Sequence, residues 1–156
     1  LANSLHEELA DDAEVLAVFS AEDAYISPNW YPTKAETHRH VPTWNYQVAH
    51  AHGRIRFSHE PKDKLAAVGR LTTFLETRIN GDDAWRMADA PKDYMDGMID
   101  NIVAFTITVD RLVAKSKLNQ NHLAVNYDAV MAKMDDMGKP GLAAAMARFR
   151  SSRGDG

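Results

Sequence analysis

Three short segments carry most of the residue types that could bind a ligand. Residues 25–34 (YISPNWYPTK) combine hydroxyls, one ammonium and large aromatic rings on a stretch stiffened by prolines. Residues 41–46 (VPTWNY) repeat this mixture, and residues 115–121 (KSKLNQN) are polar. A phosphate needs hydrogen-bond donors beside a positive charge, whereas a flat heteroaromatic ring needs an aromatic or apolar wall. The segments indicate a site for a phosphorylated planar ligand, and the alternative is a set of core anchors and surface turns.

The histidines form a second candidate cluster. His38 and His40, and likewise His50 and His52, are two residues apart, so on a strand each pair would share one face. Such pairs could bind a metal ion or, for the second pair, a haem iron. Few carboxylates lie near them in the sequence, and the absence of cysteine excludes thiolate metal sites. We therefore interpret them as ordinary loop and sheet residues and predict no metal site.

The first half of the chain has the pattern of short strands around an irregular loop. Residues 15–19 and 24–27 are rich in strand formers, and three prolines make 28–43 a shaped loop rather than a helix. Residues 43–51 and 54–59 are predicted as two strands joined by a hairpin at His52-Gly53.

The second half has helical periodicity with one clear strand. Apolar residues recur every three or four positions from Pro61 to Asn80, which predicts a helix with a single apolar stripe. A second helix is predicted after Asp89-Ala-Pro91, and residues 103–109 alternate as in a strand. Asn126 is expected to cap a helix through Met137, and Leu142–Phe149 to form a last helix. Because strands and helices do not alternate regularly, the fold class is predicted to be α+β and mainly antiparallel.

Length and charge limit the classes of protein. The 156 residues correspond to one domain over 1–150, with a mobile tail at 151–156 whose Arg-Gly-Asp tripeptide we attribute to chance. A net charge of −4 argues against a broad electrostatic surface for nucleic acid. No apolar run is long enough to span a bilayer, and neither a P-loop nor a G-x-G-x-x-G motif occurs.

The strings AYISPNWYPTK (24–34), VPTWNYQVAHAHG (41–53) and KSKLNQN (115–121) resemble the FMN-binding negative transcriptional regulators of the PaiB family. The similarity runs in order from about Leu1 to about Met137. It implies an FMN-binding split β-barrel with peripheral helices, a homodimer with FMN at the subunit interface, and a bacterial, cytoplasmic protein. Family members begin with further strands before the point that matches Leu1, so the domain is expected to be N-terminally incomplete relative to the family.

The resemblance also implies a set of cofactor-binding positions. They lie in the three matching motifs: Ser27, Trp30, Tyr31 and Lys34; Thr43, Trp44, Asn45 and Tyr46; and Lys117, Gln120 and Asn121. Asn119 stands where the family motif usually has serine. From their chemistry, Lys34 and Ser27 are predicted to face the phosphate, and Trp44 and Tyr46 to form walls for the ring.

Three functions follow from these observations. The first is a negative transcriptional regulator that binds FMN. The basic residues of 139–153 could contact DNA phosphates, and the favoured alternative for them is a solvated surface helix. The second is an FMN-dependent oxidoreductase in which His50 or Tyr46 donates a proton. The third is a haem-binding protein that uses His50 or His52. Catalytic residues are not assigned, and whether the chain is an enzyme stays open.

Overall fold

The computed structural model describes residues 3–152. The elements follow one another in this order: α1 Leu5–Glu8, β1 Glu14–Ser20, β2 Ala24–Ile26, the 3-10 helix η1 Pro28–Trp30, α2 Lys34–Thr37, β3 Thr43–Ser58, α3 Pro61–Asn80, η2 Gly81–Asp83, η3 Met87–Asp89, α4 Lys92–Asp100, β4 Ala104–Lys117, α5 Ala124–Asp136 and α6 Pro140–Ser152. The four strands and the peripheral helices confirm the α+β class.

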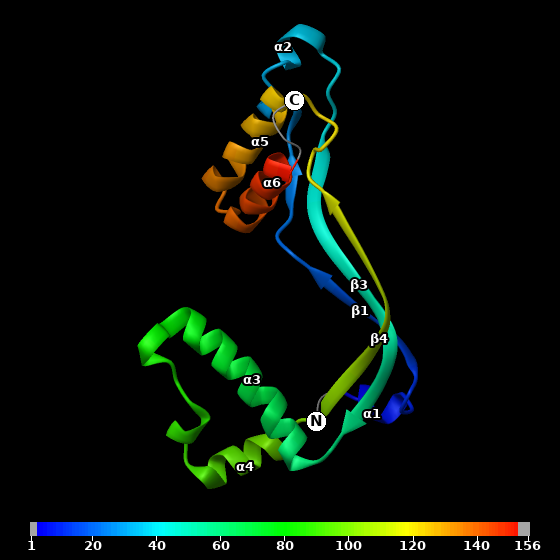
Figure 1. The fold of residues 1–156 in the computed structure, drawn as a ribbon, viewed down its shortest axis with the longest axis vertical. Helices are drawn as coiled ribbons and strands as arrows, with labels where there is room; N and C mark the ends of the chain where they lie inside the picture. The colour runs from blue at the N-terminus through cyan, green and yellow to red at the C-terminus, as the bar shows by residue number, and fades with distance from the viewer. Residues whose placement is uncertain (1–2, 153–156) are drawn as a thin grey trace. The chain divides into compact units, whose positions relative to one another are not determined.

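The sheet is organised around β3. This strand pairs with β1, β2 and β4, and Figure 1 shows β3 and β4 side by side. Strand β2 runs antiparallel to the start of β3, with Ala24 opposite Asn45 and Ile26 opposite Thr43. The motif segments around Trp30 and Trp44 are therefore joined by strand pairing.

The chain divides into two compact units. The first unit contains Leu1–Val15 and His52–Asp110, and the second contains Leu16–Ala51 and Arg111–Gly156. The boundaries fall within β1, β3 and β4, so each unit includes part of these strands.

The second unit has a continuous apolar core. Helix α5 packs against α6 (Figure 1). Their apolar side chains meet those of β2 and the following segment. The core consists of Ala24, Ile26, Tyr31, Leu118, Tyr127, Val130, Met134, Leu142, Ala143, Ala145 and Met146. The carboxylate of Glu22 caps α6, accepting a hydrogen bond from the Leu142 amide at 3.0 Å.

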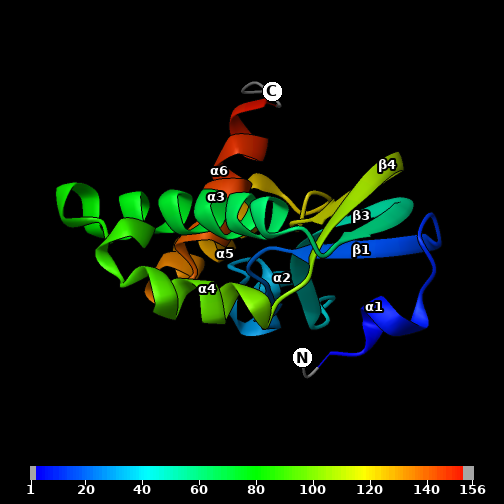
Figure 2. The same ribbon diagram turned by 90° about the horizontal axis from the view of Figure 1, so that it is seen from below.

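The first unit pairs α3 with α4, as Figure 2 shows. Helix α3 begins at Pro61 and ends at Asn80 with Gly81 at its C-cap, so both ends confirm the prediction. Its apolar stripe is present but exposed: Leu71 is 60% and Ile79 is 73% accessible. Within the described residues, the stripe thus has little apolar cover.

The predicted hairpin at His52-Gly53 is wrong, because β3 continues through both residues. A Cβ on Gly53 would lie 2.2 Å from the Thr108 carbonyl oxygen. Glycine is required here because the backbone of β4 approaches closely, not because the chain turns. Strand β4 also extends well beyond the predicted residue 109, to Lys117.

Helix termini show further differences from the expectations. Leu123 is the N-cap of α5, so Asn126 lies inside the helix, where its side-chain amide donates a hydrogen bond to the Thr33 hydroxyl instead of capping the helix. The 28–43 loop contains the short helices η1 and α2. Helix α6 includes Ser151 and Ser152 of the expected tail, whereas 153–156 and the Arg-Gly-Asp tripeptide lie outside the described residues. None of the helices within 3–152 combines the length and apolar character needed to cross a bilayer.

Candidate functional site

Two of the predicted site residues lie in the interior of the second unit. The Tyr31 side chain is buried in the apolar core, and its hydroxyl accepts a hydrogen bond from Asn119 Nδ2 at 3.1 Å. Burial raises the pKa of Tyr31, and the hydrogen bond from Asn119 opposes this in part. Asn45 is fully buried; its Nδ2 lies 3.8 Å from Met146 Sδ, and its Oδ1 has no partner within residues 3–152. Trp30 packs partly buried against the same core.

The two predicted phosphate ligands both contact Asn29. The Ser27 hydroxyl accepts the Asn29 amide N–H at 3.2 Å, which caps η1. The Lys34 ammonium donates to the Asn29 side-chain oxygen. Lys34 is exposed, and Ser27 is half-buried.

An aromatic face lies on the opposite side of β3 from Asn45, because successive side chains of a strand alternate. It consists of Tyr25, Trp44 and Tyr46. Tyr25 is paired with Trp44 across the strands, and their rings meet edge to face at 6.2 Å. The Lys115 ammonium lies 5.8 Å from the centroid of the Tyr46 ring. The predicted ring walls, Trp44 and Tyr46, therefore share one face.

The third motif forms the end of β4 and the turn after it. The Lys117 ammonium donates to the Thr43 hydroxyl at 2.7 Å, so the start of β3 and the end of β4 are joined. Gln120 closes the turn, because its Nε2 donates to the Ser116 carbonyl and its Oε1 accepts from the Leu118 amide, both at 2.7 Å. Asn119 adopts a φ of +62°, a value that asparagine tolerates better than most residues.

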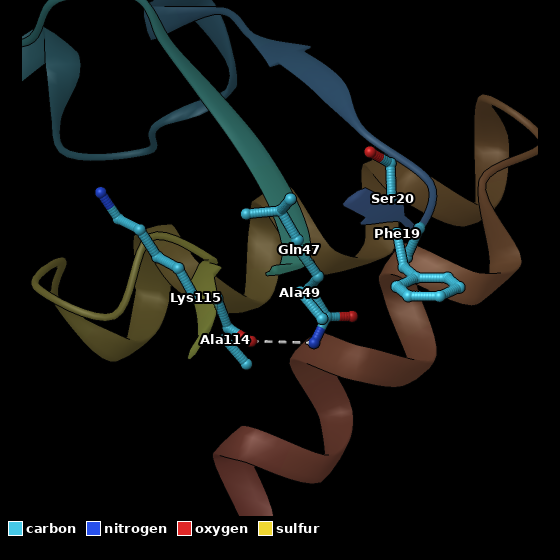
Figure 3. Close-up of a pocket in the computed structure, with 9 residues that line it drawn as sticks. Phe19, Ser20, Gln47, Ala49, Ala114 and Lys115 are labelled. Carbon is cyan, nitrogen blue, oxygen red and sulfur yellow. Dashed lines mark hydrogen bonds between the residues drawn. The ribbon is translucent and has the colours of Figure 1, made fainter. Parts of the chain in front are cut away.

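A hollow of about 330 Å³ crosses β1, β3 and β4 in the second unit (Figure 3). We call it the sheet hollow; its lining is Phe19, Ser20, Ala21, Gln47, Val48, Ala49, Ala114, Lys115 and Ser116. Gln47 Nε2 donates to the Ser116 hydroxyl at 2.9 Å. The lining combines apolar surface with several hydrogen-bonding groups. A planar ring with one apolar and one polar edge could contact the apolar surface and form hydrogen bonds with the polar groups.

A second cavity, of about 290 Å³, lies where β3 begins and β4 ends. We call it the cationic cavity; its lining is Arg39, His40, Val41, Pro42, Thr43, Lys117, Asn119, Asn121 and His122. Three of the predicted residues, Thr43, Lys117 and Asn121, thus come together.

Sequence reasoning missed Arg39, His40 and His122 at this cavity. His40 had been noted only as half of a potential metal pair, and His122 is isolated in the sequence. Their proximity depends on Tyr31, whose ring stacks on His122 at 4.6 Å and lies 4.9 Å from that of His40. Within residues 3–152, no three side chains of histidine, aspartate or glutamate are grouped to hold a metal ion.

Comparison with known proteins identifies relatives in fungi and bacteria. The chain is 32% identical to an uncharacterised protein of Emericella nidulans over 84% of its length, and 30% identical to one of Aspergillus fumigatus over 95%. It is 34% identical, over 81% of its length, to the protease synthase and sporulation protein PAI 2 of Bacillus subtilis. These matches cover 55%, 61% and 58% of the three relatives respectively, so the chain spans little more than half of each. The predicted bacterial origin stays a prediction.

The donor chemistry of the second unit fits FMN. The cationic cavity offers positively charged and neutral nitrogen donors with no carboxylate in its lining, as a phosphate requires. The sheet hollow and the aromatic face offer apolar and aromatic surface for a ring. Residues 1–111 match the family described as "Putative FMN-binding domain". The chain therefore belongs to this FMN-binding family, and FMN is the cofactor that the family assignment gives.

Proposed function

We propose that this chain is the FMN-binding part of a negative transcriptional regulator. The observation that carries the proposal is the convergence of three motif segments in the second unit: β2 pairs with β3 at Tyr25 and Trp44, and Lys117 of β4 bonds Thr43 of β3. Trp44 and Tyr46 would contact the flavin ring, and Lys115 would lie at its edge. When bound, FMN supplies one- and two-electron redox chemistry.

A visible absorption spectrum of the purified protein tests flavin binding. We expect flavin bands after reconstitution with FMN, and weaker binding in the Trp44→Ala variant because it removes half of the paired aromatic rings. Trp85→Ala is a matched control, since Trp85 is exposed to a similar degree as Trp44 and lies outside the aromatic face, the sheet hollow and the lining of the cavity between Arg39 and His122. A Soret band instead of flavin bands would favour the haem alternative, and a protein that takes up neither cofactor would remove the proposal.

DNA is proposed as the partner of the regulator. Helix α6 carries Arg148 and Arg150, and Arg150 is partly neutralised by Asp128 at 3.2 Å. A gel shift against genomic fragments should show retarded DNA that is released by salt, because phosphate contacts displace counterions. NADH oxidation by the FMN-loaded protein without any gel shift would favour the oxidoreductase alternative.

A homodimer is proposed as the working state. Leu71, Phe74 and Ile79 of α3 are each at least 60% exposed, and β4 pairs with β3 alone among the described strands. An unpaired strand edge and exposed apolar side chains favour association with a second copy. Sedimentation at micromolar concentration should give the dimer mass, and a monodisperse monomer would contradict this.

A further inference from the structure

Two basic side chains line the cationic cavity, and neither was assigned to the phosphate from the sequence. Arg39 belongs to the segment before β3, and Lys117 is the last residue of β4. His40 and His122 supply two imidazoles to the same lining. No aspartate or glutamate of the described part of the chain belongs to this lining, so the two basic side chains have no carboxylate beside them in the cavity.

The two imidazoles are held in place by the core. The buried Tyr31 ring stacks on His122 with an interplanar angle of 17°, and His40 lies against the same ring, with its Nε2 3.0 Å from the Thr33 hydroxyl. Asn119 fixes the Tyr31 hydroxyl from the β4 turn. Since a ligand site is effective when its groups are preorganised, this stack makes the cavity more than a chance gathering of surface side chains.

The basic side chains Arg39, Lys117 and Lys34 differ in their hydrogen-bond partners. Within residues 3–152, the Arg39 guanidinium has neither a hydrogen-bond nor an ion-pair partner, and Lys117 contacts only the neutral Thr43 hydroxyl. Lys34, by contrast, is bonded to the Asn29 side-chain oxygen and does not line the cavity. A dianion would gain charge-assisted hydrogen bonds from Arg39 and Lys117 without displacing any carboxylate.

The cavity also lies at a suitable place along the strands. Thr43 lines the cationic cavity and Gln47 lines the sheet hollow, four residues along β3. At about 3.3 Å per residue, they are roughly 13 Å apart along the strand. Lys115 and Lys117 place the same two regions in succession on β4. A ligand with a phosphate and a ring joined by a flexible chain could therefore occupy both.

We propose that the cationic cavity binds a phosphate monoester dianion through Arg39 and Lys117, with His40 and His122 as additional hydrogen-bond donors. Resting on the proposed function, the inference assigns the phosphate end of FMN to this cavity and not to Lys34 and Ser27. The ring would extend toward the part of the sheet hollow at Lys115, whose ammonium lies 5.8 Å from the centroid of the Tyr46 ring.

The test compares FMN with riboflavin, which lacks the phosphate, by quenching of flavin fluorescence. The wild-type protein should bind FMN more tightly than riboflavin. Lys117→Gln and Arg39→Gln should each weaken FMN binding about tenfold or more, because each removes a charged hydrogen bond, and leave riboflavin binding within about twofold. Both side chains are exposed, so circular dichroism should confirm an unchanged fold.

Lys34→Gln is the matched control, since it removes one exposed ammonium from the other candidate position. It should preserve the preference for FMN over riboflavin. If Lys34→Gln abolishes that preference while the Arg39 and Lys117 variants retain it, the cavity is not the phosphate site.

Inorganic phosphate separates failure of this inference from failure of FMN binding. Millimolar phosphate should shift the imidazole C–H proton signals of His40 and His122, and the Arg39→Gln and Lys117→Gln double variant should show smaller shifts. If neither flavin binds but these shifts appear, the anion site stands and the FMN assignment fails. If phosphate moves neither signal, the anion site itself is overturned.

Discussion

Both units contain helices with apolar faces, but these faces are buried in the second unit and exposed in the first. In the second unit, apolar side chains of α5 and α6 pack into a cluster in which Val130, Met134 and Met146 are fully buried. In the first unit, α3 has a clear apolar stripe, yet Leu71 and Ile79 are mostly exposed. Hydrophobic periodicity thus predicts where a helix forms and which face is apolar, but not what covers that face.

The largest test of this comparison is a pair of leucine truncations. Leu142→Ala removes a side chain that is 1% exposed in the second core, and the expected loss in free energy of unfolding is about 2–5 kcal/mol. At protein concentrations low enough to keep the chain monomeric, Leu71→Ala on α3 should change it by no more than about 0.5 kcal/mol. Urea unfolding followed by circular dichroism measures both. An equal loss in the two variants would show that the α3 face is covered in solution.

A glycine pair within the first unit gives the next largest effect. Gly53→Ala places a Cβ against the Thr108 carbonyl, so β3 and β4 must separate locally, and we expect a loss of about 1–3 kcal/mol. Gly97→Ala in α4 meets no atom within 4 Å and should stabilise the protein by about 0.5–1 kcal/mol through better helix propensity. Thermal unfolding distinguishes the two signs. A neutral Gly53→Ala would mean that the two strands are not in close contact at this point.

Local signals account for what the sequence predicted correctly. Pro61 and Asn80-Gly81 mark the ends of α3 because proline and glycine restrict the backbone regardless of distant contacts. Gly53 was misread because a glycine serves a tight turn and a close backbone approach equally well. Asn126 was misread because its polar partner is Thr33, which is distant in sequence.

In the candidate site, too, the sequence predicts local features but not contacts between distant segments. Trp44 and Tyr46 were predicted as ring walls from their chemistry and share one face, whereas the pairing of Trp44 with Tyr25 joins two separate motifs and is seen only in the structure. Tyr31 and Asn45 are both buried, which the motifs do not reveal: they do not show which side of β3 meets the core, nor that the residue after η1 points inward. Their place at the cofactor stays a prediction. His122 was missed because its position at the cavity depends on stacking against Tyr31, from another part of the chain.

The smallest expected effect is the pH dependence of stability that His122 contributes in the second unit. Burial, followed by the nearby His40, lowers the pKa of His122 below its usual 6.5. The folded state therefore disfavours the charged imidazole, and below pH 6.5 the unfolded chain takes up the proton more readily. Stability from this group is complete above pH 6.5 and declines as the pH falls from 6.5 toward the lowered pKa.

The His122→Asn variant should remove this contribution, so its free energy of unfolding should fall less steeply than that of the wild type as the pH drops below 6.5. Leu71→Ala, in the first unit, should keep the wild-type dependence, because it leaves the stack of His122 on Tyr31 intact. Urea midpoints measured between pH 5 and 8 provide the comparison. If His122→Asn and the wild type have parallel profiles, burial and His40 do not lower the pKa of His122 in the folded protein.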